Sequence, residues 1–196
     1  MHLTYKASLA LALLTVGAMV AAPAQAQNLV TNPGFETGDF TGYTFSGPGM
    51  VLNGSGFAHT GNYSADFNGV GQFGHLSQSI ATTTGATYNI SFFLRNDGGP
   101  NNEFKVSFAG FQGVDVVNAN VFPYTQYSFT TVATGPSSIL QFDAFQNPSH
   151  WLLDDISVTA ANPVPEASSV VSLGLLLLLG LGGVAVSRRR KAGAAR

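Results

Sequence analysis

The chain has 196 residues and a formal net charge of −2, with 45% hydrophobic residues, 9% charged residues and no cysteine. The lack of cysteine excludes a disulfide framework and a thiol nucleophile. Between residues 27 and 162 two bases, Arg95 and Lys105, stand against nine Asp and Glu side chains, a net charge of −7. Such an acidic surface argues against nucleic acid and anionic lipid as partners.

The N-terminus has the three parts of a secretory signal peptide. Lys6 gives a positive start, residues 9–22 form a short apolar run, and Ala24-Gln25-Ala26 fits a small-x-small cleavage site. The shortness of the run argues against an N-terminal membrane anchor. We therefore expect a signal peptide over residues 1–26 and a mature chain that begins at Gln27.

Residues 27–160 have the length of one domain and the pattern of an all-β protein. Apolar side chains alternate with polar ones over residues 88–94, 104–108, 127–130, 140–144 and 152–158, and clusters of turn residues separate these runs. The pattern predicts a single antiparallel β-sandwich or jelly roll. In the last run, Leu152, Asp154, Ile156 and Val158 should share the buried face, although a shift of one residue would exchange Asp154 with Asp155.

The C-terminus combines a short linker, one apolar run and a basic cluster. Residues 161–169 form the linker, which contains Pro165-Glu166, and the apolar residues that follow predict a transmembrane helix over residues 170–187. The tail 188–196 opens with Arg188, Arg189, Arg190 and Lys191, which should stay in the cytoplasm. These features suit a plain membrane anchor or a sorting signal.

Catalytic motifs are hard to find between the two ends. There is no Gly-x-Ser-x-Gly nucleophile elbow, and His59, His75 and His150 lack the spacing of metal ligands on one helical turn. No pair of carboxylates stands out as a glycosidase dyad. We therefore expect that the protein is not an enzyme.

The C-terminal arrangement resembles the PEP-CTERM sorting signal of Gram-negative bacteria. The resemblance implies processing by an exosortase-type protease at the inner membrane. The protein would then be periplasmic, cell-surface or extracellular, and the family is linked to exopolysaccharide and biofilm. Ala167 replaces the second proline of the usual Pro-Glu-Pro motif, which leaves cleavage itself open.

The two ends of the domain resemble carbohydrate-binding modules with the galactose-binding-like jelly-roll fold. The motifs that carry the resemblance are Asn32-Pro33-Gly34-Phe35-Glu36 and Trp151-Leu152-Leu153-Asp154-Asp155-Ile156. It implies a structural Ca²⁺ held by Glu36 and Asp154, since Ca²⁺ prefers carboxylate and carbonyl oxygens. A carboxylate on an apolar face is costly unless paired or metal-bound. The alternative is that Asp154 caps a turn through backbone N–H groups and Glu36 is solvated.

Six aromatic residues are the candidate ligand platforms: Tyr43, Phe57, Tyr63, Phe73, Tyr124 and Trp151. Sugar rings stack on exposed aromatic side chains, and Trp151 and Tyr43 are the predicted ligand-binding residues, although each could instead pack in the core. The polar loop that contains Asn101 and Asn102 is either a ligand contact or a simple turn. The predicted function is non-catalytic glycan binding in an exopolysaccharide or biofilm matrix. The alternative is a structural matrix or surface protein without sugar binding.

Overall fold

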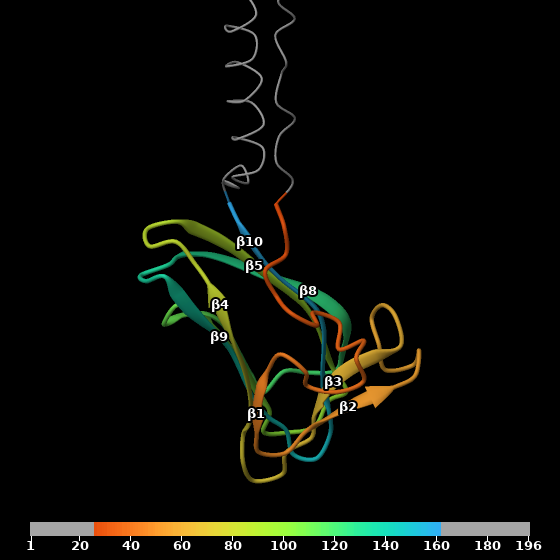
Figure 1. Cartoon of the computed structure of the whole chain (residues 1–196). Helices are drawn as coiled ribbons and strands as arrows, with labels where there is room; N and C mark the ends of the chain where they lie inside the picture. Colours follow the sequence, from red (N-terminus) through yellow and green to blue (C-terminus); the bar gives the residue numbers. More distant parts are fainter. Residues whose placement is uncertain (1–25, 162–196) are drawn as a thin grey trace, which may run out of the picture.

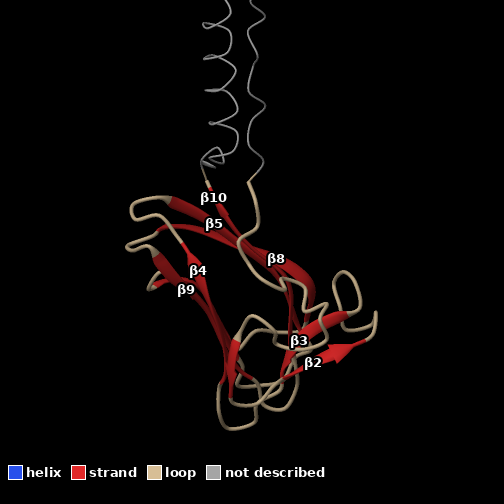
Figure 2. Cartoon of the chain, in the orientation of Figure 1, coloured by secondary structure: helices blue, strands red, loops and turns tan. Residues whose placement is uncertain are grey.

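The computed structural model describes residues 26–161, which form two facing antiparallel β-sheets (Figures 1 and 2). The predicted signal peptide, apart from Ala26, and the predicted tail with Pro165, Glu166 and residues 188–191 lie outside the described residues. Within residues 26–161 no helix is long and apolar enough to cross a membrane. The described domain is all-β, as the alternating pattern predicted.

Each sheet has five strands, and most connections cross from one sheet to the other. Sheet A has the order β1 (Thr44–Ser46), β4 (Gly74–Ala81), β9 (Ser137–Phe145), β6 (Glu103–Phe108) and β7 (Phe111–Val117). Sheet B has the order β2 (Met50–Asn53), β3 (Tyr63–Phe67), β10 (Trp151–Ala160), β5 (Thr87–Asn96) and β8 (Phe122–Val132). Among the strands of residues 26–161, only β2–β3 and β6–β7 are consecutive strands paired in one sheet. The central strands therefore contact partners far away in the sequence.

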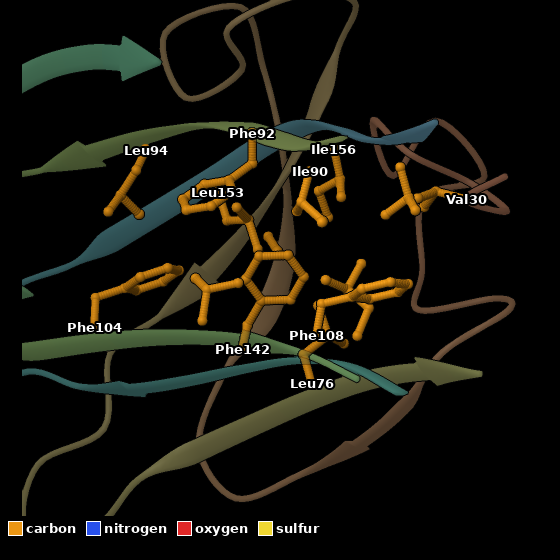
Figure 3. Packing of buried hydrophobic residues seen from close by; sticks show 14 of the residues in the cluster. Val30, Leu76, Ile90, Phe92, Leu94, Phe104, Phe108, Phe142, Leu153 and Ile156 are labelled. Atoms are coloured by element: carbon orange, nitrogen blue, oxygen red, sulfur yellow. The ribbon is translucent and has the colours of Figure 1, made fainter. Parts of the chain in front are cut away.

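Large apolar side chains from both sheets meet in one core (Figure 3). Phe92 of β5 lies edge-on to Phe142 of β9 at a centroid distance of 5.5 Å, and Phe104 of β6 packs against both. These side chains have no exposed surface. Because each fully buried ring stabilises the fold by about 2–3 kcal/mol, the alternating strands account for most of the driving force.

Strand β10 departs from simple alternation. Trp151 and Leu153 belong to the core cluster, so Leu152 and Asp154 point to the other face. The register shifts between Asp154 and Ser157, and Asp155 has a φ of 48°, which marks a bulge. The bulge returns Ile156 and Val158 to the core, and Figure 3 shows Ile156 there. The expectation that Leu152 and Asp154 lie on the same face as Ile156 and Val158 was therefore wrong, because one extra residue at the bulge reverses the alternation.

The first described residues run beside the last strand. The backbone N–H of Leu29 donates to the carbonyl of Val158, and that of Ile156 donates to the carbonyl of Pro33. The Asn28 side chain donates to the carbonyl of Ile156 and accepts from the N–H of Val158. The opening and closing motifs are thus adjacent in space.

Candidate functional site

A long loop covers part of the outer face of sheet B. This loop, residues 54–62, joins β2 to β3. The Tyr124 hydroxyl donates to the Phe57 carbonyl at 2.5 Å, and the Arg95 guanidinium donates to the Gly56 carbonyl at 2.8 Å. The His59 ring stacks on Phe93 at a centroid distance of 3.7 Å. These contacts hold the loop against the outer side of β5 and β8.

A row of charged side chains crosses the outer face of sheet A. His75 on β4 pairs in register with Asp143 on β9, which pairs with Lys105 on β6, which pairs with Asp115 on β7. Three strand spacings make this row about 14 Å long. The His75 Nδ1 lies 2.5 Å from the Asp143 Oδ1, and Lys105 pairs with Glu103. Lys105 is one of the two bases of the domain, so the row carries much of its positive charge.

Aromatic rings lie beside this row. Phe73, just before β4, is 5.6 Å from Phe145 at the end of β9 and 6.2 Å from the His75 ring, centroid to centroid. The Lys105 ammonium lies 5.5 Å from the Phe73 centroid. Phe73 and Phe145 are half-buried, and the His75 side chain is 49% exposed. Aromatic and charged groups from three strands thus share one surface.

The amide of Gln141 fixes the orientation of the central carboxylate. Its Nε2 donates to both oxygens of Asp143, at 2.8 and 3.0 Å. His75 also contacts Oδ1, so two neighbours hold Asp143, which still keeps part of its surface exposed. We call Phe73, His75, Lys105, Gln141, Asp143 and Phe145 the sheet A patch. It offers ring edges and faces for C–H groups and fixed polar atoms for hydroxyls.

Trp151 and Tyr43, the two predicted ligand-binding residues, do not lie in this patch. Trp151 has no exposed surface; its ring packs against Phe104, and its Nε1 donates to the Phe145 carbonyl at 3.1 Å. The prediction that Trp151 is an exposed ligand platform was therefore wrong, because the first strand position of β10 points into the core. Tyr43 is half-buried and stacks on Phe35 at 5.5 Å, and burial raises the pKa of its hydroxyl. Tyr43 also belongs to the packing of the domain.

The two predicted metal ligands converge on one segment, residues 59–63. Asp154 has no exposed surface, and its Oδ2 accepts from the backbone N–H groups of His59 and Thr60 at 2.8 and 3.2 Å. The Glu36 Oε1 accepts from the N–H groups of Asn62 and Tyr63 at 2.9 and 3.1 Å. Both carboxylates therefore organise the entry into β3 through hydrogen bonds with the backbone.

These contacts compensate Asp154 without a cation. Its Oδ1 accepts from the backbone N–H of Asp155 at 2.7 Å, so every hydrogen bond it accepts comes from the backbone. Burial nevertheless raises the pKa of Asp154 to about 6. Among residues 26–161 no group of three or more His, Asp or Glu side chains is placed to hold a metal ion. The geometry fits the turn-capping alternative, and Ca²⁺ binding stays a prediction.

Comparisons with known proteins connect this sandwich to carbohydrate-binding modules. No family model matches the chain. The chain is 28% identical over 175 residues to endo-1,4-β-xylanase A of Thermoanaerobacterium saccharolyticum, and the match covers 76% of this chain and 15% of the xylanase. It thus spans only a small part of that enzyme.

Solved structures of carbohydrate-binding modules have a similar fold. A family 61 carbohydrate-binding module in complex with β-1,4-galactotriose has a TM-score of 0.56 and 22% identity, over 67% of this chain and 97% of the module. The tandem family 22 modules of Xyn10C from Paenibacillus barcinonensis have a TM-score of 0.53 and 18% identity, over 75% of this chain and 49% of theirs. The family 22 and catalytic modules of Clostridium thermocellum xylanase 10B, complexed with xylohexaose, have a TM-score of 0.51 and 17% identity, over 71% and 30%. The chain has a carbohydrate-binding-module fold.

The patch residues were only partly visible in the sequence. Phe73 is one of the six aromatic candidates, but nothing in the sequence distinguishes it from the other five, and Phe145 extends the predicted run at residues 140–144 by one residue. His75 and Asp143 are 68 positions apart, and only the register of β4 with β9 brings them together. Periodicity within one strand carries no information on that register.

Proposed function

We propose that this protein is a non-catalytic glycan-binding protein that contacts its ligand with the sheet A patch. The observation that carries the proposal is the Phe73–Phe145 ring pair beside the His75–Asp143–Gln141 hydrogen-bonded set. C–H faces of a sugar ring pack on aromatic surfaces, and its hydroxyls need donors and acceptors that are already oriented. The patch supplies both within one row of strands.

An open sheet face suits the interior of a polysaccharide better than its end. The patch lies across neighbouring strands of sheet A, so consecutive sugar units can contact different strands. Structures with the same fold are complexed with β-1,4-galactotriose and xylohexaose, which makes these two oligosaccharides reasonable first probes. Both are neutral, which avoids repulsion from a domain with a net charge of −7.

The signal peptide and the C-terminal segment of the sequence support a proposal for the localisation of the protein. We propose export through the signal peptide, anchoring in the inner membrane through residues 170–187, and processing by an exosortase-type protease near Pro165-Glu166. The processed protein would be periplasmic, cell-surface or extracellular, with exopolysaccharide of a biofilm matrix as its partner. The alternative, a structural matrix protein without sugar binding, predicts flat polar faces with buried rings. Phe73 and Phe145 keep part of their surface exposed, which favours glycan binding.

The test is affinity electrophoresis of the full-length protein in gels that contain xylan, β-1,4-galactan or the exopolysaccharide of the host. We expect at least one polysaccharide to retard the protein. Phe73→Ala and Phe145→Ala should each weaken the affinity for the polysaccharide about five- to tenfold, because a lost ring contact is worth about 1–1.4 kcal/mol. Phe111→Ala is the matched control, since Phe111 is a 50% exposed ring on β7 outside the patch.

Thermal melts of each variant separate lost binding from lost folding. A folded Phe73→Ala protein that is retarded like the wild type would remove the patch from the proposal. Absence of retardation by every polysaccharide would favour the structural matrix protein.

A further inference from the structure

A pocket of about 470 Å³ lies at one end of the sandwich, outside the sheet A patch. The loop between β5 and β6 and the loop between β7 and β8 form its walls. The lining includes Gly98, Gly99, Asn101, Asn118, Asn120 and Val121. This volume lies within the usual range of small-molecule sites, which is about 300–1,000 Å³.

Two buried amide side chains, Asn96 and Asn102, connect the two loops by hydrogen bonds. The Asn96 Nδ2 donates to the carbonyls of Ala119 and Asn120 at 3.0 and 3.1 Å. The Asn102 amide donates to the carbonyls of Gly99 and Ala119 and accepts from the N–H of Ala119 at 2.8 Å. Both amides are almost completely buried. Because both loops are held by the same side chains, the pocket is preformed and a ligand has little ordering cost to meet.

The lining combines polar and apolar surface and carries no charged side chain. Asn101, Asn118 and Asn120 are exposed, and each amide can donate and accept hydrogen bonds. Val121, which is 69% exposed, adds an apolar wall. Neutral amides beside an exposed aliphatic side chain complement a ligand that has both hydroxyls and C–H groups. A charged ligand would find no ionic partner in this lining.

We propose that this loop pocket is a second binding site, which takes a terminal unit of a neutral glycan. A pocket between two loops admits the end of a chain, whereas the sheet A patch suits a chain interior. The register that pairs Glu103 with both Phe145 and Val117 places the pocket next to the aromatic end of the patch. The second site rests on the proposed function only for its class of ligand, a neutral glycan. Its residues are separate, because no residue of the sheet A patch lines the pocket.

The experiment is a ¹H–¹⁵N NMR titration of the full-length protein with β-1,4-galactotriose and, separately, with xylohexaose. We expect the backbone signals of residues 98–101 and 118–121 and the Asn101 and Asn118 side-chain amides to shift. The test variant is Asn101→Gly with Asn118→Gly. Asn101 and Asn118 have φ values of 57° and 50°, so glycine removes the amides without backbone strain.

The double variant should weaken binding at the pocket about tenfold or more, because it removes two hydrogen-bonding side chains. The control is Asn53→Gly with Asn62→Gly, at either end of the loop between β2 and β3 and outside the pocket lining. It should leave the pocket shifts unchanged. No shift at the pocket with either sugar, or equal affinity in the Asn101/Asn118 variant, would overturn the second site. If Phe73→Ala abolished the shifts at the pocket, the pocket would not be an independent site. If Phe73→Ala and Phe145→Ala left retardation by polysaccharides unchanged, the sheet A patch would be excluded but the pocket would not.

Discussion

Asp154 accepts three backbone N–H hydrogen bonds at a point where its side chain has no exposed surface. Burial disfavours the ionised carboxylate and raises its pKa from 3.8 to about 6, although the three donors act in the opposite direction. Burial also raises the pKa of Asp66, while its contact with His150 lowers it. A raised carboxyl pKa means that the folded state binds a proton more tightly than the unfolded chain does.

This proton affinity predicts an unusual pH dependence in metal-free buffer with EDTA. Between pH 3.8 and about 6 the folded state holds more protons at Asp154, so the free energy of unfolding should fall as pH rises through this window. The pKa difference corresponds to a loss of roughly 3 kcal/mol. Urea unfolding at several pH values measures it. Asp154→Asn should be less stable at every pH, because it loses an acceptor, but its slope over this window should be much smaller.

The same experiment in excess Ca²⁺ tests the predicted ion. An ion between Glu36 and Asp154 would favour the ionised carboxylate, so the free energy of unfolding should rise with pH and EDTA should lower the melting temperature. Glu36→Ala should remove the response to EDTA. Identical curves with Ca²⁺ and with EDTA would leave backbone capping as the sole role of Asp154 and would contradict the calcium site.

At the scale of strands, the alternating pattern located β5, β6, β8, β9 and β10. Most of these strands are long, and β5, β6 and β9 alternate buried positions with more exposed ones, so period two is strong. The short β1 and β2 contain too few residues for a periodic signal, and the inward face of β4 includes the polar Gln78, which bonds the backbone of Thr31. The bulge at Asp155 was not predictable from residue types, because it depends on how β10 aligns with β5.

The contact of β7 with β8 joins the edges of the two sheets and gives a prediction for Gly113. A Cβ at this position would overlap the Phe129 ring of β8. Gly113→Ala should therefore lower the free energy of unfolding by about 1–3 kcal/mol, since overpacking forces neighbouring side chains or strands apart. Gly56→Ala is the matched control, because a Cβ there meets no atom within 4 Å. Equal urea midpoints for the two variants would show that the edges are not held together at this point.

At the scale of the whole molecule, the sheet A patch and the loop pocket both depend on contacts between distant segments. The sequence predicted an all-β domain with aromatic candidates and a polar loop. The prediction that Trp151 is an exposed platform was wrong, because a shift of one residue along a strand moves a side chain from the surface to the core. The patch needs the pairing of β4 with β9, and the pocket needs two loops that Asn96 and Asn102 join. Long-range register of this kind is set by the complete core and not by any local motif.

The route of the protein to its site is the last prediction, and intact mass spectrometry of the protein from its host measures it. We expect a mature chain that begins at Gln27 and ends near Pro165-Glu166, because the small-x-small site and the sorting motif mark these two points. Ala167→Pro, which restores the usual Pro-Glu-Pro motif, should increase the cleaved fraction, and Glu166→Ala should decrease it. A mass that retains residues 170–196 in all three proteins would identify a plain membrane anchor. In that case the β-sandwich domain would act at the membrane surface and would not be released into a matrix.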